Sequence, residues 1–325
     1  MVRISCAISR EGLFMHFSVI IPAKNEESNI GRCLDSLRKL DYDGSRYEVI
    51  VVDNGSSDRT VEIARQKGAL VFVQPDMTIS GLRNFGAAQA RGEILAFLDA
   101  DCTVLENWLN EAACYLLRKE VACFGSPPIV PENATWVQNA WFLIRKRENP
   151  VQAADWLESM NMFVRREIFA EISGFDESLV TCEDYDLSLR LKTKGLLLND
   201  NGIVAIHHGE AATVATFFRK EKWRGLSNYR GLMRHGFVWK EIPSIVAPPV
   251  HCLLALAVGM TPLIKYPGLG NVIIFLFVVW QSVLFFLSVR KNRAQVDIVK
   301  IMQLYLLLNV YFSARGLAVF GGRNR

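Results

Sequence analysis

The sequence predicts an α/β domain with a mostly parallel sheet, followed by C-terminal transmembrane helices. Up to about residue 209, short apolar runs alternate with amphipathic segments, which is typical of parallel strands joined by crossover helices. Beyond residue 241 the chain is dominated by long apolar runs of about the ~20 residues that a bilayer requires. With 325 residues, the chain also exceeds one typical domain of ~100–200 residues.

Four apolar runs predict the parallel strands of the first region. β-branched residues dominate the first three runs, and a proline or a turn sequence ends the first two. The segments between the runs carry apolar residues at helical spacing, so each one predicts a crossover helix. The expected strands are residues 17–22, 47–53, 70–73 and 93–98, and the expected helices begin at Ser28, at Asp58 and at about Ile79.

Asp99-Ala100-Asp101 directly follows the fourth run. Ligands of open α/β sheets bind at the carboxyl ends of the strands, so two carboxylates there could hold a divalent cation against a diphosphate. Oxygen ligands suit Mg²⁺ or Mn²⁺. Because the motif is short, a solvated loop is its commoner explanation when it stands alone. Its meaning therefore depends on the other motifs.

Four further motifs occur in a fixed order around these elements. Two follow the first and second strands, one opens a crossover helix, and one is acidic. They are Pro22-Ala23-Lys24-Asn25-Glu26, Asp53-Asn54-Gly55-Ser56-Ser57-Asp58, Gly81-Leu82-Arg83-Asn84-Phe85-Gly86, and Gly174-Phe175-Asp176-Glu177 followed by Glu183-Asp184-Tyr185-Asp186-Leu187-Ser188-Leu189-Arg190. Together with Asp99-Ala100-Asp101, they resemble the family 2 glycosyltransferases, which have the GT-A nucleotide-sugar fold. The resemblance covers roughly residues 17–208.

The resemblance implies a nucleotide-sugar donor, with a UDP-sugar favoured. Asp53 would accept a hydrogen bond from the base, and Asp99 would reach the ribose or a metal-bound water. Considered alone, Asp53 is a typical turn-initiating residue and Arg83 a typical surface arginine. The expected donor-binding residues are Pro22, Ala23, Asn25, Glu26, Asp53, Ser56, Arg83 and Asp99.

The resemblance also implies a metal site. Asp101 would be a direct ligand, Asp99 would lie beside it, and a histidine would complete the site. His207 and His208 both follow an apolar run, and the sequence does not decide between them; a single histidine is also often structural. The expected cofactor is Mn²⁺ or Mg²⁺, which would neutralise the diphosphate leaving group.

Asp184 is the general base that the resemblance implies, and Glu183 could share this role. A carboxylate can deprotonate the acceptor hydroxyl as that hydroxyl attacks the anomeric carbon, and a single displacement inverts this carbon. Acids at the start of a helix also complement the helix dipole, which would explain them without catalysis. On the acceptor side we expect Asn161, Met162 and Trp156.

Composition sets the expected domain boundaries. Two apolar segments, residues 242–264 and 269–289, predict membrane spans, and basic residues before the first and after the second place both of those ends inside. A third segment, residues 298–320, contains Lys300, Asn309 and Arg315 and fits either a span or an interfacial helix.

The expected regions are an N-terminal extension without a signal-peptide pattern (1–16), the GT-A catalytic domain (17–215), a basic amphipathic interface segment (216–241) and a membrane region (242–325).

The expected partners are a nucleotide-sugar donor, a lipid-linked or glycan acceptor and membrane lipids. A net charge of +4 gives little support to nucleic-acid binding, and seven cysteines without a C-x-x-C pair are typical of a reducing compartment. We therefore expect a multi-pass protein of the cell inner membrane with a cytoplasmic catalytic domain.

Two alternative functions remain. One is a GT-A-like nucleotidyltransferase, although residues 22–26 lack glycine. The other is a catalytically silent membrane scaffold of a polysaccharide assembly complex, although Asp101 and Asp184 are present.

Overall fold

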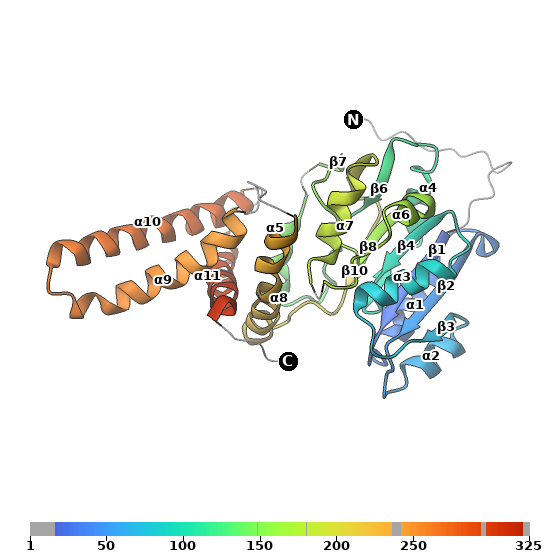
Figure 1. Cartoon of the computed structure of the whole chain (residues 1–325), viewed down its shortest axis with the longest axis horizontal. Helices are drawn as coiled ribbons and strands as arrows, with labels where there is room; N and C mark the ends of the chain where they lie inside the picture. Colours follow the sequence, from blue (N-terminus) through green and yellow to red (C-terminus); the bar gives the residue numbers. More distant parts are fainter. Residues whose placement is uncertain (1–16, 148, 180, 236–241, 294–296, 321–325) are drawn as a thin grey trace. The chain divides into compact units, whose positions relative to one another are not determined.

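A computed structural model of the chain describes residues 17–147, 149–179, 181–235, 242–293 and 297–320, and the side chains of 226–243 and 319–320 are not described. The chain forms two compact units, one from Met1–Pro131 and Arg147–Gly209 and the other from Glu132–Lys146 and Glu210–Arg325 (Figure 1). The expected N-terminal extension lies outside the described residues.

The first unit contains an eight-stranded, mostly parallel sheet, which confirms the predicted fold class. The strands of this sheet are β1 (Phe17–Ala23), β2 (Tyr47–Asp53), β3 (Leu70–Val73), β4 (Ile94–Leu98), β6 (Val121–Gly125), β7 (Val151–Ala153), β8 (Asn161–Arg165) and β9 (Leu196–Asp200). Their order is β3-β2-β1-β4-β8-β6-β9-β7. β8 runs antiparallel to both of its neighbours and β7 runs antiparallel to β9, whereas the other neighbours are parallel. A separate antiparallel pair is formed by β5 (Cys102–Val104) and β10 (Ala205–His207).

Helices cover both faces of this sheet, because successive side chains of a strand point to opposite faces. Val19 and Ile21 of β1 belong to one buried layer, with the apolar residues of α1 and α4. Ile20 belongs to the other, with those of α3 and α7. The first helix begins at Ile30, with Asn29 as its N-cap residue, and not at Ser28 as expected. The helices of this unit are α1 (Ile30–Arg38), α2 (Thr60–Gln66), α3 (Ile79–Gln89), α4 (Trp108–Ala113), α6 (Arg166–Glu171) and α7 (Glu183–Leu191).

Gly86 allows α3 to lie close to the sheet. A Cβ atom at this position would lie 2.5 Å from Cγ2 of Ile20 and 3.2 Å from Cγ2 of Val52, so any side chain would push the helix away. Interiors pack too densely to absorb such a change without a shift. The distance between α3 and β1 therefore depends on this glycine. Because Arg83 and Asn84 belong to α3, the glycine also fixes how far these two residues lie from the sheet.

The second unit is helical and consists of α5 (Trp136–Arg145), α8 (Val214–His235), α9 (Ile242–Met260), α10 (Pro267–Lys291) and α11 (Ile298–Phe320). The structure draws the domain boundary differently from our expectation, because α5 lies within the expected catalytic domain. The Trp141 ring of α5 lies 5.0 Å from the Phe217 ring and 5.5 Å from the Tyr311 ring, so α5 packs with α8 and α11.

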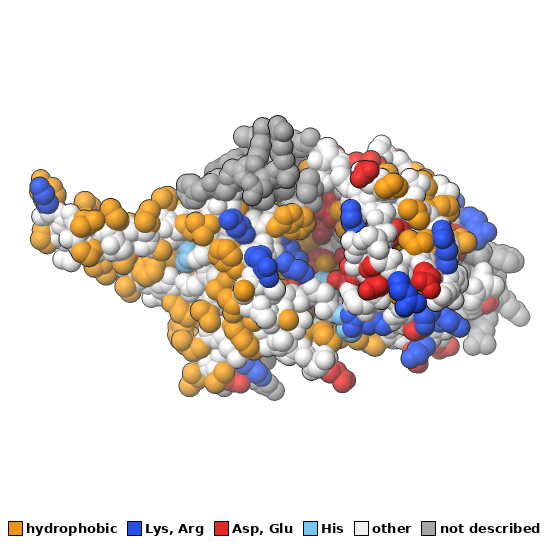
Figure 2. All heavy atoms as spheres, turned by 90° about the horizontal axis from the view of Figure 1, so that it is seen from below, with side chains coloured by type: hydrophobic (Ala, Val, Ile, Leu, Met, Phe, Trp, Pro, Cys, Tyr) orange, Lys and Arg blue, Asp and Glu red, His pale blue; other side chains and the backbone are white. Residues whose placement is uncertain are grey.

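Within the described residues, two helices are long and apolar enough to cross a membrane, Ser244–Leu263 and Pro267–Lys291. Many apolar side chains of α9 and α10 are exposed, and they lie along the face of this hairpin that Figure 2 shows. α11 is not among these candidates. It runs beside α8, with Leu304 and Leu307 buried and Nε of Arg315 2.9 Å from Oε2 of the buried Glu221 (Figure 1). α11 therefore packs on α8, and its predicted place in or at a membrane stays a prediction.

Candidate active site

The loops that follow β1 and β2 are joined by hydrogen bonds. Asn25 has a left-handed backbone (φ 55°), and its Oδ1 accepts from the backbone N of Ser57 at 2.9 Å. The backbone N of Asn25 donates to Oγ of Ser56 at 2.8 Å, and that of Glu26 donates to Oγ1 of Thr60 at 2.7 Å. Several expected donor-binding residues therefore share one rim at the carboxyl end of the sheet.

Asp53 is fully buried, and its side chain accepts hydrogen bonds within the turn that follows β2. Its Oδ1 accepts from the backbone N of Ser56 at 2.8 Å, and its Oδ2 accepts from Oγ of the same serine. Pro22 and Ala23 are also buried, opposite Val52 and Asp53 in the register of β1 and β2. Asp53 thus has the turn-initiating role in this structure, and its carboxylate is not exposed to a nucleotide base as we had expected.

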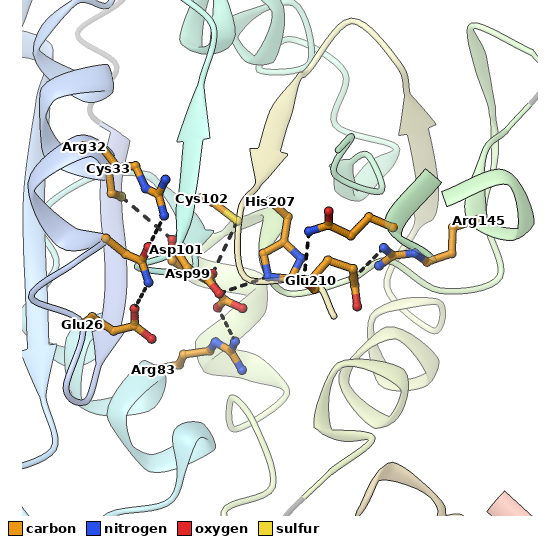
Figure 3. A network of polar contacts seen from close by, with 12 residues as sticks. Glu26, Arg32, Cys33, Arg83, Asp99, Asp101, Cys102, Arg145, His207 and Glu210 are labelled. Atoms are coloured by element: carbon orange, nitrogen blue, oxygen red, sulfur yellow. Dashed lines mark hydrogen bonds and ion pairs between the residues drawn. The ribbon is translucent and has the colours of Figure 1, made fainter. Parts of the chain in front are cut away.

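Asp99 and Asp101 follow β4 and have different partners (Figure 3). Oδ1 of Asp99 lies 2.8 Å from Nη2 of Arg83, and Oδ2 of Asp101 lies 3.1 Å from Nε2 of His207. The Asp99 side chain is 23% exposed and that of Asp101 is 19% exposed, so a ligand can reach both carboxylates. Burial, and next the charges of Asp101 and Asp99, raise the pKa of Glu26. Three carboxyl groups therefore share this end of the sheet.

His207, and not His208, faces Asp101. β10 pairs with β5 so that His207 lies opposite Cys102, the residue after Asp101. The ring of His208 points elsewhere, with its Nε2 2.9 Å from Oγ1 of Thr103. Of the two histidines that the sequence offered, the structure brings His207 to the expected metal ligand.

Gly209 has no side chain, and this leaves room for the Asp101 carboxylate beside the His207 ring. A Cβ atom there would lie 1.7 Å from Oδ2 of Asp101 and 3.2 Å from Nε2 of His207. A carboxylate suits Mn²⁺ or Mg²⁺, so the donor set fits the expected cation. No group of three His, Cys, Asp or Glu side chains that could hold a metal is found in the part of the chain that the structure describes. Asp101 and His207 are the two side chains here that could hold a cation.

We expect Gly209→Ala to weaken Mn²⁺-dependent nucleotide binding, because the new Cβ forces the Asp101 carboxylate to move. Changes to the groups that orient a metal ligand typically cost about 10–100-fold in metal affinity. Isothermal titration with a nucleoside diphosphate in the presence of Mn²⁺ measures the loss. Gly44→Ala is the matched control, since no atom lies within 4 Å of its added Cβ. Equal affinity in the two variants would contradict the proposed cation site.

Arg83 is buried between the two acidic motifs. Besides its contact with Asp99, its Nη1 lies 3.0 Å from Oε1 of Glu183, and its guanidinium lies 5.4 Å from the centroid of the Phe175 ring. The residue is 1% exposed. In this structure the Arg83 side chain is closed off from solvent and holds two carboxylates, so its expected contact with a base or phosphate stays a prediction.

Glu183 and Asp184 begin α7 but have different surroundings. Glu183 contacts Arg83, whereas Oδ1 of Asp184 accepts from the backbone N of Tyr185 at 2.8 Å. Burial, and next the carboxylates of Glu183 and Glu158, raise the pKa of Asp184, while the Arg83 charge lowers it. A carboxylate with a raised pKa is a stronger base. Asp184 is therefore better suited than its ion-paired neighbour to accept a proton.

The expected acceptor-side residues separate into two groups. Asn161 and Met162 are fully buried in β8, and Oδ1 of Asn161 accepts from Nε1 of Trp108 at 2.9 Å while its amide donates to backbone carbonyl groups. These two side chains belong to the core in this structure, and their expected place beside an acceptor site stays a prediction. Trp156 is half-buried, and its ring lies 6.4 Å from that of Tyr185 on α7.

Two residues of the site were missed in the sequence. Gly209 directly follows the histidine pair, and its position there was the available signal. Asn84 lies inside the motif Gly81–Gly86, and its side chain contacts the loop at Phe175 and Glu177. Neither role can be inferred from the residue type alone, because both depend on a neighbour distant in sequence.

Comparison with known proteins places this site in context. Residues 18–172 match the family model described as glycosyl transferase family 2. Glycosyltransferase AglE of Haloferax volcanii is 32% identical over 190 residues, which cover 56% of this chain and 62% of that protein. The β-monoglucosyldiacylglycerol synthase of Synechocystis sp. is 27% identical over 255 residues, covering 69% of this chain and 51% of that enzyme. The chain thus spans about half to three fifths of the length of these relatives.

Among solved structures, a mannosyltransferase from Pyrobaculum calidifontis in complex with GDP-Man and Mn²⁺ superimposes with a TM-score of 0.62. The alignment covers 91% of this chain and 86% of that one at 17% sequence identity. At this level of identity, the similarity establishes the fold.

Proposed function

Because residues 18–172 belong to glycosyltransferase family 2, we propose that this chain is an inverting, metal-dependent glycosyltransferase that acts at a membrane. The proposal rests on one observation above all. The pair formed by Asp101 and His207 and the acidic start of α7 meet at the carboxyl end of the sheet, with Arg83 between Asp99 and Glu183. This is the edge at which open α/β sheets bind ligands.

The donor is a nucleotide sugar. A UDP-sugar is the first candidate, from the resemblance of the loops after β1 and β2. A GDP-sugar is the second, because the similar mannosyltransferase was solved with GDP-Man. The exposed Asn25 and the half-buried Glu26 and Ser56 form the accessible part of the rim that would contact the nucleotide.

Asp101 and His207 would hold the cation. When bound, Mn²⁺ or Mg²⁺ would neutralise the charge of the diphosphate leaving group. Asp99, fixed by Arg83, would orient the ribose. Asp184 would accept the proton of the acceptor hydroxyl during a single inverting displacement, so no covalent intermediate with the protein is required.

The acceptor is lipid-linked or a glycan, and the catalytic domain lies at the cytoplasmic face of the inner membrane. Three observations support this. α9 and α10 are suited to a membrane hairpin. Arg219, Lys222 and Trp223 are exposed at i, i+3 and i+4 on α8, a pattern that fits an anionic lipid surface. One relative is by its name a glycolipid synthase. Lys220 and Arg224 of the expected interface segment are half-buried, and the side chains of Arg230, Arg234 and Lys240 are not described.

We expect the full-length chain to stay in the membrane pellet after washing with concentrated salt and then with alkaline carbonate. A hairpin held by apolar burial gains ~25 cal/mol per Å², which salt does not screen, whereas a purely ionic attachment is screened. Immunoblots of pellet and supernatant measure the partition. Release of the intact chain by either wash would show that α9 and α10 do not span.

A donor screen on the detergent-solubilised, full-length chain tests the function. UDP- and GDP-sugars are incubated with membrane lipid extract, with Mn²⁺ or with EDTA. Release of nucleoside diphosphate, together with a labelled sugar on the lipid fraction, would support the proposal. A nucleotidyltransferase, given a sugar phosphate and a nucleoside triphosphate, would release pyrophosphate instead. A scaffold would give neither product.

A further inference from the structure

Two consecutive residues of α3, Arg83 and Asn84, contact both the end of β4 and the chain that leads into α7. α3 itself is held against β1 by the close approach at Gly86. Arg83 reaches Asp99, 16 residues away in sequence, and Glu183, 100 residues away. Asn84 reaches the segment 175–177, which precedes α7. One turn of one helix therefore joins the two acidic motifs (Figure 3 shows the contact with Asp99).

Arg83 acts here as the counter-charge between two carboxylates. Each is bound through a different nitrogen, Nη2 for Asp99 at 2.8 Å and Nη1 for Glu183 at 3.0 Å. Only a planar guanidinium presents two such donors at a fixed separation; the single ammonium group of lysine does not. Because the group is buried, its contacts are weakly screened, and its loss would leave the two acids facing each other.

The nitrogen and the oxygen of the Asn84 side-chain amide both form hydrogen bonds to the loop at residues 175–177. Nδ2 donates to the carbonyl of Phe175 and to Oε1 of Glu177, each at 2.9 Å, and Oδ1 accepts from the backbone N of Phe175 at 2.9 Å. At Gly174, φ is +65° and a Cβ would lie 2.5 Å from Oδ1 of Asn84. Only glycine adopts this conformation readily, so the loop closes directly onto the amide.

We propose that Arg83 and Asn84 are positioning residues that set the location of the Asp184 base relative to Asp99 and Asp101. In this proposal neither residue contacts the donor. Arg83 acts through Glu183, the neighbour of Asp184, and Asn84 acts through the loop that leads to α7. This inference rests on the proposed function for its kinetic consequence, while its structural consequence can be measured without any substrate.

The kinetic test compares Arg83→Lys and Asn84→Asp with the parent chain. Arg83→Lys keeps the positive charge but has only one nitrogen in place of the two that bind Asp99 and Glu183. Asn84→Asp keeps the shape of the side chain, but its carboxylate cannot donate to Glu177 and repels it. For both we expect single-turnover transfer to fall by about 10²-fold, the cost of misplacing reacting groups by about an ångström. The Mn²⁺-dependent affinity for the nucleoside diphosphate should fall by much less than the transfer rate, because Asp101 and His207, the proposed cation ligands, keep their own contact. If Arg83 contacted the donor, this affinity would fall together with the rate.

The structural test uses hydrogen exchange of the full-length chain without substrate, so it stands even if the donor screen fails. Both variants should exchange faster in segment 174–179 and at the start of α7, with the melting temperature kept near that of the parent. Arg59→Lys and Asn107→Asp are the matched controls, since they make the same changes at exposed contacts with Glu62 and Glu111. Unchanged exchange in both variants would overturn the proposal, as would a general loss of protection throughout the domain.

Discussion

Replacing Asp184 by asparagine is expected to slow sugar transfer by about 10²–10⁴-fold, the usual contribution of a general base. Asparagine keeps the shape of the side chain, and its carbonyl oxygen can still accept from the backbone N of Tyr185. It cannot accept the proton of the acceptor hydroxyl. Since Asp184 is not among the proposed cation ligands, Mn²⁺-dependent nucleotide binding should persist. Single-turnover transfer at saturating donor, beside calorimetry, separates the two effects.

The pH profile provides a second readout of the same variant. The base acts only when it is deprotonated, and burial together with Glu183 and Glu158 raises the pKa of Asp184. The transfer rate of the parent chain should therefore rise with pH over a range more alkaline than that of an ordinary aspartate. Asp184→Asn should lose this rise.

Two further variants make the assignment specific. Asp155→Asn is the control, because Asp155 is exposed and pairs with Lys192; we expect it to transfer sugar normally. Glu183→Gln reveals whether Glu183 shares the role. Near-normal transfer by Asp184→Asn would refute its role as the base and leave these acids as a feature of the helix start.

Asp101→Asn is expected to lower Mn²⁺-dependent affinity for the nucleoside diphosphate by about 10²–10³-fold, because a bound metal contributes several kcal/mol of charge stabilisation. An amide has no charge to offer the cation, although it keeps the size of the side chain beside His207. Turnover should fall along with binding, unlike in Asp184→Asn. Calorimetry with Mn²⁺ and with EDTA measures the metal-dependent part.

The control for this variant is Asp35→Asn, which removes a surface ion pair with Lys67. Such pairs contribute at most about 1 kcal/mol to stability, so nucleotide binding should be unaffected. A metal-dependent affinity retained by Asp101→Asn would mean that the cation is held elsewhere. Equal melting temperatures of the two variants would exclude unfolding as the cause of a loss.

The sequence by itself determined the elements whose signal is local. The strand runs 17–22, 47–53 and 70–73 are apolar and β-branched over a few consecutive residues, and β1, β2 and β3 form there. The apolar lengths of α9 and α10 could likewise be read directly, because a bilayer requirement acts on a single continuous segment. The location of Asp99 and Asp101 at the end of the sheet followed from the same pattern, since parallel strands place their carboxyl ends at one edge.

Only the tertiary structure decided which partner each polar side chain has. His207 faces Asp101, and His208 does not, because β10 pairs with β5 in one register, and a shift by one residue would exchange them. Arg83 contacts an acid 100 residues away, and Asn161 is buried by strands that are distant in sequence. A residue type shows what a side chain can bind, whereas burial and register, which arise from contacts across the whole chain, determine what it does bind.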